Sequence, residues 1–199
     1  MIRLPEVALA EAAQEGLCAL QDEVDAAGAY AERVAAGKRL FELRNRRGNP
    51  VFDEVRRALE QMCSGAVRCA YCEDSRADEV EHVRPKDLYP EVVFFWGNYV
   101  YACGPCNGPK RNHFGVFVAG RSEIVELARK PHAPIVPPVP GDPVMIDPRV
   151  EDATRLMVLD LRDTFLFTPI AARGTRDYDR ADYTIRVLRL NLRPELARA

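Results

Sequence analysis

The sequence predicts an α+β protein in which a small cysteine-rich core lies between a helical N-terminal region and a C-terminal β-hairpin with a helix. Three observations predict this class: helical spacing of apolar residues in the first third, a cluster of cysteine, glycine and aromatic residues in the middle, and two strand-like runs before a final helical pattern. A chain of 199 residues that is 47% hydrophobic can bury a core of its own. The regions we expect are 1–66, 67–115, 116–143 and 144–199.

The N-terminal region, residues 1–66, predicts three helices. Two helical patterns cover residues 8–20 and 26–43. The third helix has the clearest start, because Asn49 can cap it and Pro50 suits the first helical position. The region carries 9 basic and 11 acidic side chains and no catalytic signature. We therefore expect it to pack against the core or to dock a partner protein. The apolar face of the third helix consists of Phe52, Val55, Leu59 and Met62.

The C-terminal half of the chain predicts a linker, a hairpin and a helix. Residues 116–143 are expected to form a helix and then a proline-rich linker, since the many prolines of PHAPIVPPVPGDP lack amide donors. The strands of the hairpin should flank Arg162 and Asp163. The expected elements of region 144–199 are strands at 155–161 and 164–170, a helix over 179–191, and a further helix opened by Pro194.

Net charge and the length of apolar runs exclude two classes of protein. The 28 basic and 30 acidic side chains give a formal net charge of −2, so the chain is not coated with positive charge for nucleic acid, although a local basic patch remains open. No apolar run approaches the roughly 20 residues that a membrane-spanning helix needs. The N-terminus lacks the apolar segment of a secretory signal. We therefore expect a cytoplasmic protein without a membrane partner.

Four of the six cysteines form two C-x2-C pairs about 30 residues apart. Each pair places two thiolates on one side of a tight turn, and two such turns form a closed tetrahedral site that suits structural zinc. The alternative, a pair of redox dithiols, requires a thioredoxin-like βαβ pattern that is absent here. Cys18 and Cys63 are interpreted as small core residues. The predicted zinc ligands are Cys69, Cys72, Cys103 and Cys106.

The segment that contains these cysteines resembles a known family. It reads CAYCE, then EHVRPK, WGNYVYACGPCN and a lysine, over residues 67–112. This order resembles the zinc-bearing HNH endonucleases, and the wider frame resembles the HNH proteins of bacterial anti-phage systems, including retron-associated and Septu-type systems. The later segment TIRVLRLN resembles the same group more weakly. The resemblance implies a ββα-metal core and a partner ATPase.

The resemblance also assigns roles that suit phosphodiester hydrolysis. His82 would be the general base, a role that fits an imidazole with a pKa near neutrality. Glu81 and Asn107 would supply hard oxygen ligands to a catalytic Mg²⁺ or Mn²⁺. Asn98 would fix the loop and orient the base. Many members of the family carry aspartate where this chain has Glu81, which changes the reach of that ligand.

The substrate is the least determined part of the prediction. Region 67–115 carries 6 basic and 7 acidic side chains, so attraction to nucleic acid requires the bound ion, local basic residues or another segment. DNA is favoured as the substrate of an anti-phage effector, RNA such as tRNA is the alternative, and a catalytically silent zinc-scaffolded binding module is the second alternative. The predicted nucleic-acid contacts are Arg84, Lys86, Lys110 and Arg111.

Overall fold

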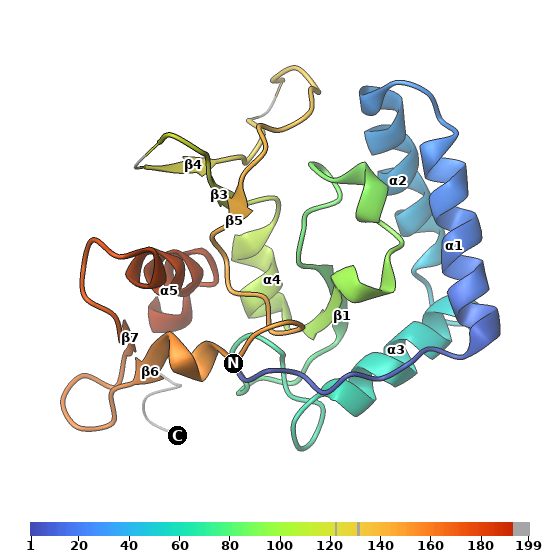
Figure 1. The fold of residues 1–199 in the computed structure, drawn as a ribbon. Coiled ribbons are helices and arrows are strands. Elements are labelled where there is room, and N and C mark those ends of the chain that lie inside the picture. Colours follow the sequence, from blue (N-terminus) through green and yellow to red (C-terminus); the bar gives the residue numbers. More distant parts are fainter. Residues whose placement is uncertain (122, 131, 193–199) are drawn as a thin grey trace.

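A two-stranded antiparallel sheet lies between the N-terminal helices and the C-terminal elements (Figure 1). The computed structural model describes residues 1–121, 123–130 and 132–192. Strand β1 (Glu79–His82) pairs with β2 (Tyr99–Ala102), with Glu79 opposite Ala102 and His82 opposite Tyr99. Helix α4 (Gly104–Lys110) follows β2 directly and contacts β1. The chain thus has a mixed α+β fold with small sheets, as predicted.

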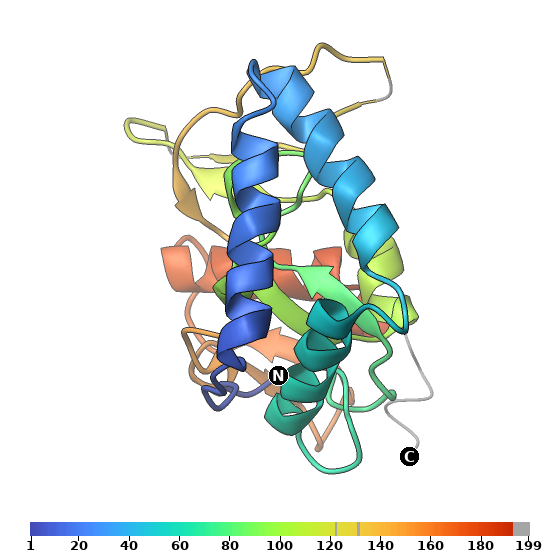
Figure 2. The same ribbon diagram turned by 90° about the vertical axis from the view of Figure 1, so that its right-hand side faces the viewer.

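The three predicted N-terminal helices are present. They are α1 (Glu11–Asp25), α2 (Tyr30–Arg44) and α3 (Pro50–Met62), and the first two lie side by side in Figure 2. Asn49 caps α3 as expected, because its Oδ1 accepts hydrogen bonds from the amides of Val51 and Phe52. Helix α3 packs onto the central sheet through its contacts with β2, and α1 packs against both α2 and α3.

An aromatic cluster joins the helices to the sheet. The ring of Phe41 on α2 lies 5.6 Å from that of Phe52 on α3, and Phe52 lies 6.3 Å from Tyr99 on β2. The same continuous core extends through the cysteine turns to Met145 and Leu188. Buried residues of regions 1–66, 67–115 and 144–199 therefore share one hydrophobic core, and Phe117 and Ile124 of region 116–143 pack against its edge. Cys18 does not belong to it: the expectation of a core cysteine is wrong there, because Cys18 lies on the exposed face of α1.

Region 116–143 differs from its prediction, because the expected helix is absent from its described residues. The chain forms a three-stranded sheet in the order β4-β3-β5, from β3 (Gly115–Phe117), β4 (Ile124–Glu126) and β5 (Asp142–Pro143). Short runs of β-branched residues favour strands, and Gly120 has a positive φ of 77° in the turn between β3 and β4. The proline-rich segment then returns to the sheet, and Pro143 is tolerated because β5 is an edge strand.

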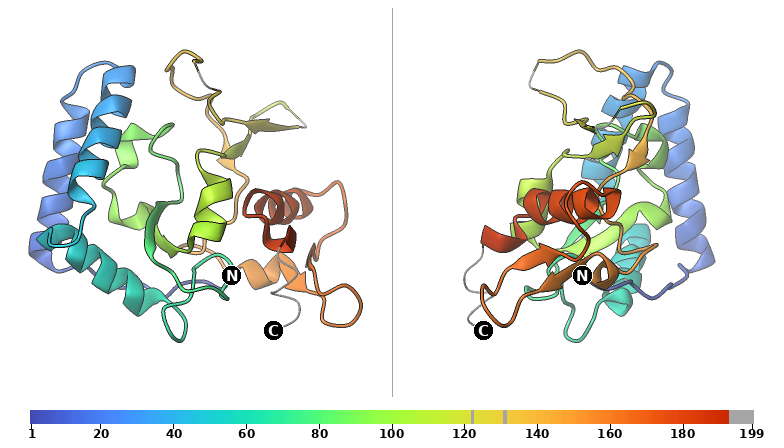
Figure 3. Two further views of the ribbon diagram at one scale, coloured as in Figure 1. Left: turned by 180° about the vertical axis from the view of Figure 1, so that it is seen from behind. Right: turned by 60° about the vertical axis from the view of Figure 1, so that its left-hand side comes forward.

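The predicted C-terminal hairpin and helix are present and lie across the molecule from α1 and α2 (Figure 3). Strand β6 (Met157–Leu159) pairs with β7 (Phe167–Pro169), and α5 (Arg176–Val187) follows. The loop between the strands is longer than expected, because Asp160 accepts hydrogen bonds from the amides of residues 162, 163 and 164. The helix expected after Pro194 lies outside the described residues.

Short 3-10 helices complete the described chain. They are η1 (Pro90–Val92) and η2 (Trp96–Asn98) between the central strands, and η3 (Ala153–Arg155) and η4 (Leu190–Leu192) near the C-terminus. Among the described helices, none combines the length and the apolar character that crossing a bilayer requires.

Candidate functional site

Four cysteine sulfur atoms lie together in the core, as the sequence predicts. The Sγ atoms of Cys69, Cys72, Cys103 and Cys106 all lie within 4.8 Å of one another, and the four residues are buried. The Sγ atoms of Cys72 and Cys103 are 3.8 Å apart. Tetrahedral zinc with Zn–S bonds of about 2.3 Å separates its sulfur ligands by about 3.8 Å. The set of four thiols therefore fits a metal such as zinc, and four cysteine ligands would leave no coordination position of the metal open.

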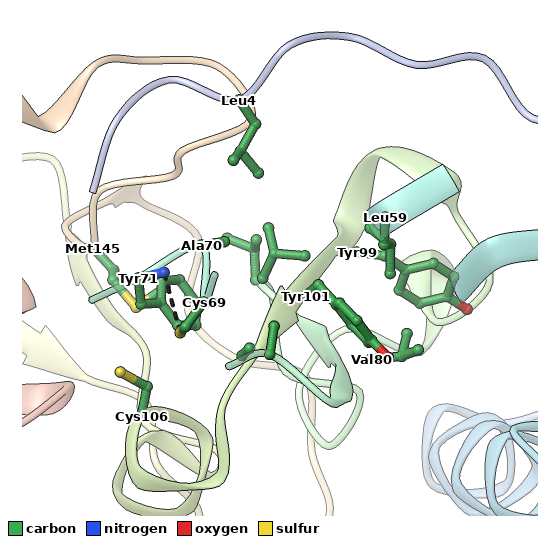
Figure 4. Packing of buried hydrophobic residues seen from close by; sticks show 14 of the residues in the cluster. Leu4, Leu59, Cys69, Ala70, Tyr71, Val80, Tyr99, Tyr101, Cys106 and Met145 are labelled. Atoms are coloured by element: carbon green, nitrogen blue, oxygen red, sulfur yellow. Dashed lines mark hydrogen bonds between the residues drawn. The ribbon is translucent and has the colours of Figure 1, made fainter. Parts of the chain in front are cut away.

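Backbone hydrogen bonds attach the first cysteine turn to the central sheet. The amide of Ala70 donates to the carbonyl oxygen of Tyr101 in β2, at 2.9 Å. Figure 4 shows the Tyr71 amide pointing at the Cys69 sulfur, a contact of 3.4 Å, with Met145 and Cys106 nearby. Because the amide donates to sulfur, it stabilises the thiolate form that a metal requires.

The second cysteine turn begins helix α4. Cys103 is the residue before the helix, and the amides of Cys106 and Asn107 donate to its carbonyl oxygen at 3.0 Å and 2.9 Å. Asn107 therefore follows a metal-binding turn directly. A metal held by the cysteines would fix the first turn of α4 and, with it, the side chain of Asn107.

His82 lies at the end of β1 and is almost completely buried. Its Nε2 is 2.9 Å from the carbonyl oxygen of Val93, which also accepts a 2.7 Å hydrogen bond from the Tyr99 hydroxyl. The ring of Phe41 packs edge-on against the imidazole, with 4.4 Å between ring centres. A carbonyl oxygen can only accept, so Nε2 carries the proton and Nδ1 of the neutral ring is the acceptor.

Burial determines the protonation of this histidine. Desolvation, with a smaller contribution from the ammonium of Lys86, lowers the pKa of His82 well below its ordinary value. The side chain is therefore neutral at pH 7. A neutral imidazole with its Nδ1 lone pair unused by Val93 is the form that a general base needs.

Glu81 points toward helix α4, where it meets a buried lysine. The ammonium of Lys110 donates to Glu81 Oε1 at 2.6 Å and to the carbonyl oxygen of His82 at 2.8 Å. Lys110 is completely buried. The predicted contact of Lys110 with phosphate has no support in this structure, because its ammonium is turned onto β1 while Asn107, on the same helix, stays partly exposed in the cleft.

Asn107 contacts a carboxylate that the sequence analysis did not single out. Its Nδ2 donates to Glu79 Oε2 at 2.5 Å, and its Oδ1 accepts no hydrogen bond within the described residues. Glu79 and Glu81 lie on the same face of β1, because side chains alternate along a strand. That alternation is the signal that could have identified Glu79 from the sequence.

Asn98 holds the loop that follows β1. The amide of Arg84 donates to Asn98 Oδ1 at 2.8 Å, and Asn98 Nδ2 donates to the carbonyl oxygens of Arg84 and Val92, each at 3.0 Å. Asn98 is buried, and all three bonds are to backbone. These contacts fix the chain two residues after His82 and one residue before Val93, while Asn98 stays buried.

A cleft of about 760 Å³ opens over this cluster. Of the four predicted nucleic-acid contacts, Lys86 and Arg111 line the cleft, and Arg84 and Lys110 do not. The ammonium of Lys86 lies 5.0 Å from the ring centre of Phe41, and burial lowers its pKa. Arg84 instead lies over the ring of Tyr89. From the central core, the cleft is lined by Asp78, Glu79, Val80, Glu81, His82, Pro85, Lys86, Asp87, Asn107, Arg111 and Asn112.

Comparison with known proteins relates part of the chain to a Septu protein. The chain is 40% identical over 73 residues to Septu protein PtuB from Bacillus thuringiensis. The match covers 33% of this chain and 28% of that protein, so it spans less than a third of the relative's length. No family model and no solved structure matches the chain. The chain is therefore similar to a Septu protein over about a third of its length.

Proposed function

We propose that this chain is a metal-dependent HNH-type endonuclease that hydrolyses phosphodiester bonds, with DNA as the favoured substrate. One observation carries the proposal: the neutral imidazole of His82 and the oxygen donors Glu79, Glu81 and Asn107 line the same cleft. Phosphodiester hydrolysis needs a base for the attacking water and positive charge beside the phosphate. The cleft combines the base with ligands for the cation that supplies this charge.

The donor set fits a hard divalent cation. Carboxylate and amide oxygens are the ligands that Mg²⁺ and Mn²⁺ prefer, and Asn107 Oδ1 is unused within the described residues. Glu81 is already paired with Lys110, so it would offer its second oxygen. A bound Mg²⁺ or Mn²⁺ would polarise the scissile phosphate and neutralise charge that develops on it.

His82 performs the proton transfer in this proposal. Its Nδ1 takes one proton from a water molecule while the water oxygen attacks phosphorus, and one phosphorus–oxygen ester bond breaks. The leaving oxygen acquires a proton from solvent. The imidazolium that forms is held by Val93, whose carbonyl oxygen accepts from Nε2. Asn98 keeps that loop in place through its three backbone hydrogen bonds.

The similarity to a Septu protein supports a role as the effector of a bacterial anti-phage system. We propose that the chain acts in the cytoplasm with a partner protein, an ATPase, and that its zinc is structural. The net charge of −2 is consistent with weak intrinsic affinity for nucleic acid, which a partner would overcome.

Incubation of the purified chain with plasmid DNA and with total tRNA, under Mg²⁺ and under Mn²⁺, tests this function. His82→Gln is the inactive variant, because glutamine can still donate to Val93 but cannot act as the base. The exposed His113 provides the matched control, His113→Gln. Cleavage by the parent and by His113→Gln, but not by His82→Gln, is expected. Equal cleavage by all three, or none by the parent with its partner ATPase present, rejects the proposal. Cleavage of tRNA alone would assign RNA as the substrate.

A further inference from the structure

The second wall of the cleft comes from the N-terminal helices, which the sequence analysis treated only as a packing or docking region. Five residues of α2, α3 and the loop that connects them line it. They face the catalytic cluster directly, since Phe41 touches His82 and lies under the ammonium of Lys86. The residues of this second wall are Lys38, Phe41, Asn45, Arg47 and Arg56.

Three of these five side chains are cationic, and they differ in how firmly they are held. Arg56 is fixed, because its guanidinium donates to Asn45 Oδ1 at 2.6 Å and pairs with the carboxylate of Asp53, which is 46% exposed, at 3.2 Å. Lys38 is 52% exposed and pairs with Asp87 at 2.8 Å. Arg47 is exposed, and within the described residues no hydrogen bond or ion pair holds it. The wall thus combines a positioned guanidinium with one that is free to meet a ligand.

The region that forms the opposite wall of the cleft carries a small excess of negative charge. Region 67–115 carries 7 acidic and 6 basic side chains. Four cysteine thiolates around a zinc ion would add further net negative charge. The catalytic core by itself does not attract a polyanion. The end of α2 and the loop after it supply positive charge beside the cleft, since Arg44, Arg46 and Arg47 occur within four residues and Arg47 lines the cleft. The excess of acidic residues over region 1–66 conceals this local cluster.

We propose that the α2–α3 wall binds the sugar–phosphate backbone of the nucleic acid that His82 cuts, through Lys38, Arg47 and Arg56. This inference rests on the proposed endonuclease function and extends it to a part of the chain outside the HNH-like segment. Arginine suits the role because its planar guanidinium can donate two hydrogen bonds to one phosphate. The contacts are to phosphate and therefore carry no sequence information.

Binding measurements with matched arginine variants test the wall. Arg47→Gln removes the free guanidinium that lines the cleft. Arg39→Gln is the control, because Arg39 is also exposed and without a hydrogen bond or ion pair in the described chain, but lies outside the cleft lining. Both are placed in the His82→Gln full-length chain with Mg²⁺ present. Fluorescence anisotropy then follows a labelled mixed-sequence DNA duplex across a series of salt concentrations.

The salt dependence of the DNA affinity measures how many phosphate contacts the chain makes. Each phosphate contact on duplex DNA contributes about 0.9 to the slope of log K against log salt concentration. We expect Arg47→Gln to reduce the slope by about 0.9, Arg47→Lys to retain it, and Arg39→Gln to leave it unchanged. Equal slopes for Arg47→Gln and Arg39→Gln would overturn the inference while cleavage by the parent still supported the endonuclease function. An absence of binding to both DNA and RNA, with the partner ATPase present, would overturn both.

Discussion

The ammonium of Lys110 lies 2.6 Å from a carboxylate oxygen of Glu81, and the lysine is completely buried. The same ammonium donates to the carbonyl oxygen of His82, so one side chain of α4 holds the last two residues of β1. Burying two charges is costly, and their attraction offsets that cost only while both partners remain. Lys110 therefore positions the strand that carries the proposed base.

Lys110→Met is expected to destabilise the chain severely. It leaves the Glu81 carboxylate buried without its partner, and breaking such a pair costs about 3–5 kcal/mol. The matched control is Lys38→Met, which breaks a more exposed pair with Asp87 and should cost about 0–1 kcal/mol. Urea denaturation of the zinc-loaded proteins measures both values.

The double variant Lys110→Met/Glu81→Gln separates the ion pair from simple packing. Removing the orphaned charge should recover a substantial part of the lost stability, because the amide of glutamine is less costly to bury than a carboxylate. If the double variant is as unstable as Lys110→Met alone, the loss comes from packing of the lysine side chain and not from an unpaired carboxylate.

The pH dependence of cleavage should reflect the buried state of His82. The base must be neutral, and burial lowers the pKa of His82 below its ordinary value of about 6.5. The acid limb of kcat/KM is therefore expected below about pH 6.5. A pH–rate profile with the half-exposed His113 replaced by glutamine should be unchanged. An acid limb well above pH 6.5 would show that another group, or an exposed histidine, limits the reaction.

The same shift predicts how stability changes with pH. Between the lowered pKa of folded His82 and about 6.5, the unfolded chain binds a proton that the folded chain does not. Stability should therefore fall as the pH decreases through this range, and His82→Gln should remove that contribution. His113→Gln, at a half-exposed position, should leave it in place.

Replacement of one clustered cysteine should remove the metal. Cys69→Ser or Cys106→Ser takes one ligand from a closed set of four, and the binding energy of such a site is also folding energy. Both variants are expected to lose bound zinc and to unfold or aggregate, as measured by elemental analysis and thermal denaturation. Cys18→Ser is the control, since its thiol lies on the surface of α1. One zinc retained per chain in both variants would contradict the assignment.

Signals that act over a few residues were sufficient to predict the helix caps and the metal-binding turns. Asn49 and Pro50 mark the start of α3 in the sequence and in the structure, and the spacing of the cysteines anticipates their cluster. The burial of Lys110 could not be predicted in this way. It depends on which face of the short helix α4 packs against β1, and spacing alone places Lys110 beside Asn107 without saying whether solvent or protein faces them.

The lining of the cleft also could not be predicted from the sequence, because it joins residues that are far apart in the chain. Arg47 and His82 line one cavity although 35 positions separate them, because Phe41 packs against the imidazole and brings α2 to the end of β1. No periodicity in either segment encodes that contact. A count of charges over a whole region also conceals a local cluster, as it does for Arg44 at the end of α2 and for Arg46 and Arg47 in the loop after it.

Glu79→Gln tests whether the carboxylate beside Asn107 is a ligand of the catalytic ion. Glu79 and Glu81 share one face of β1, but Lys110 already balances the charge of Glu81. Among the described residues no cation pairs with Glu79, so its charge should attract Mg²⁺ more strongly. We expect Glu79→Gln to raise the Mg²⁺ concentration for half-maximal cleavage by about 10-fold or more. Glutamine can still accept from Asn107, so the fold should be retained, and Glu60→Gln on the exposed face of α3 provides the control. If Glu81→Gln shifts the Mg²⁺ requirement and Glu79→Gln does not, Glu79 only positions Asn107, and Glu81 is the carboxylate that holds the ion.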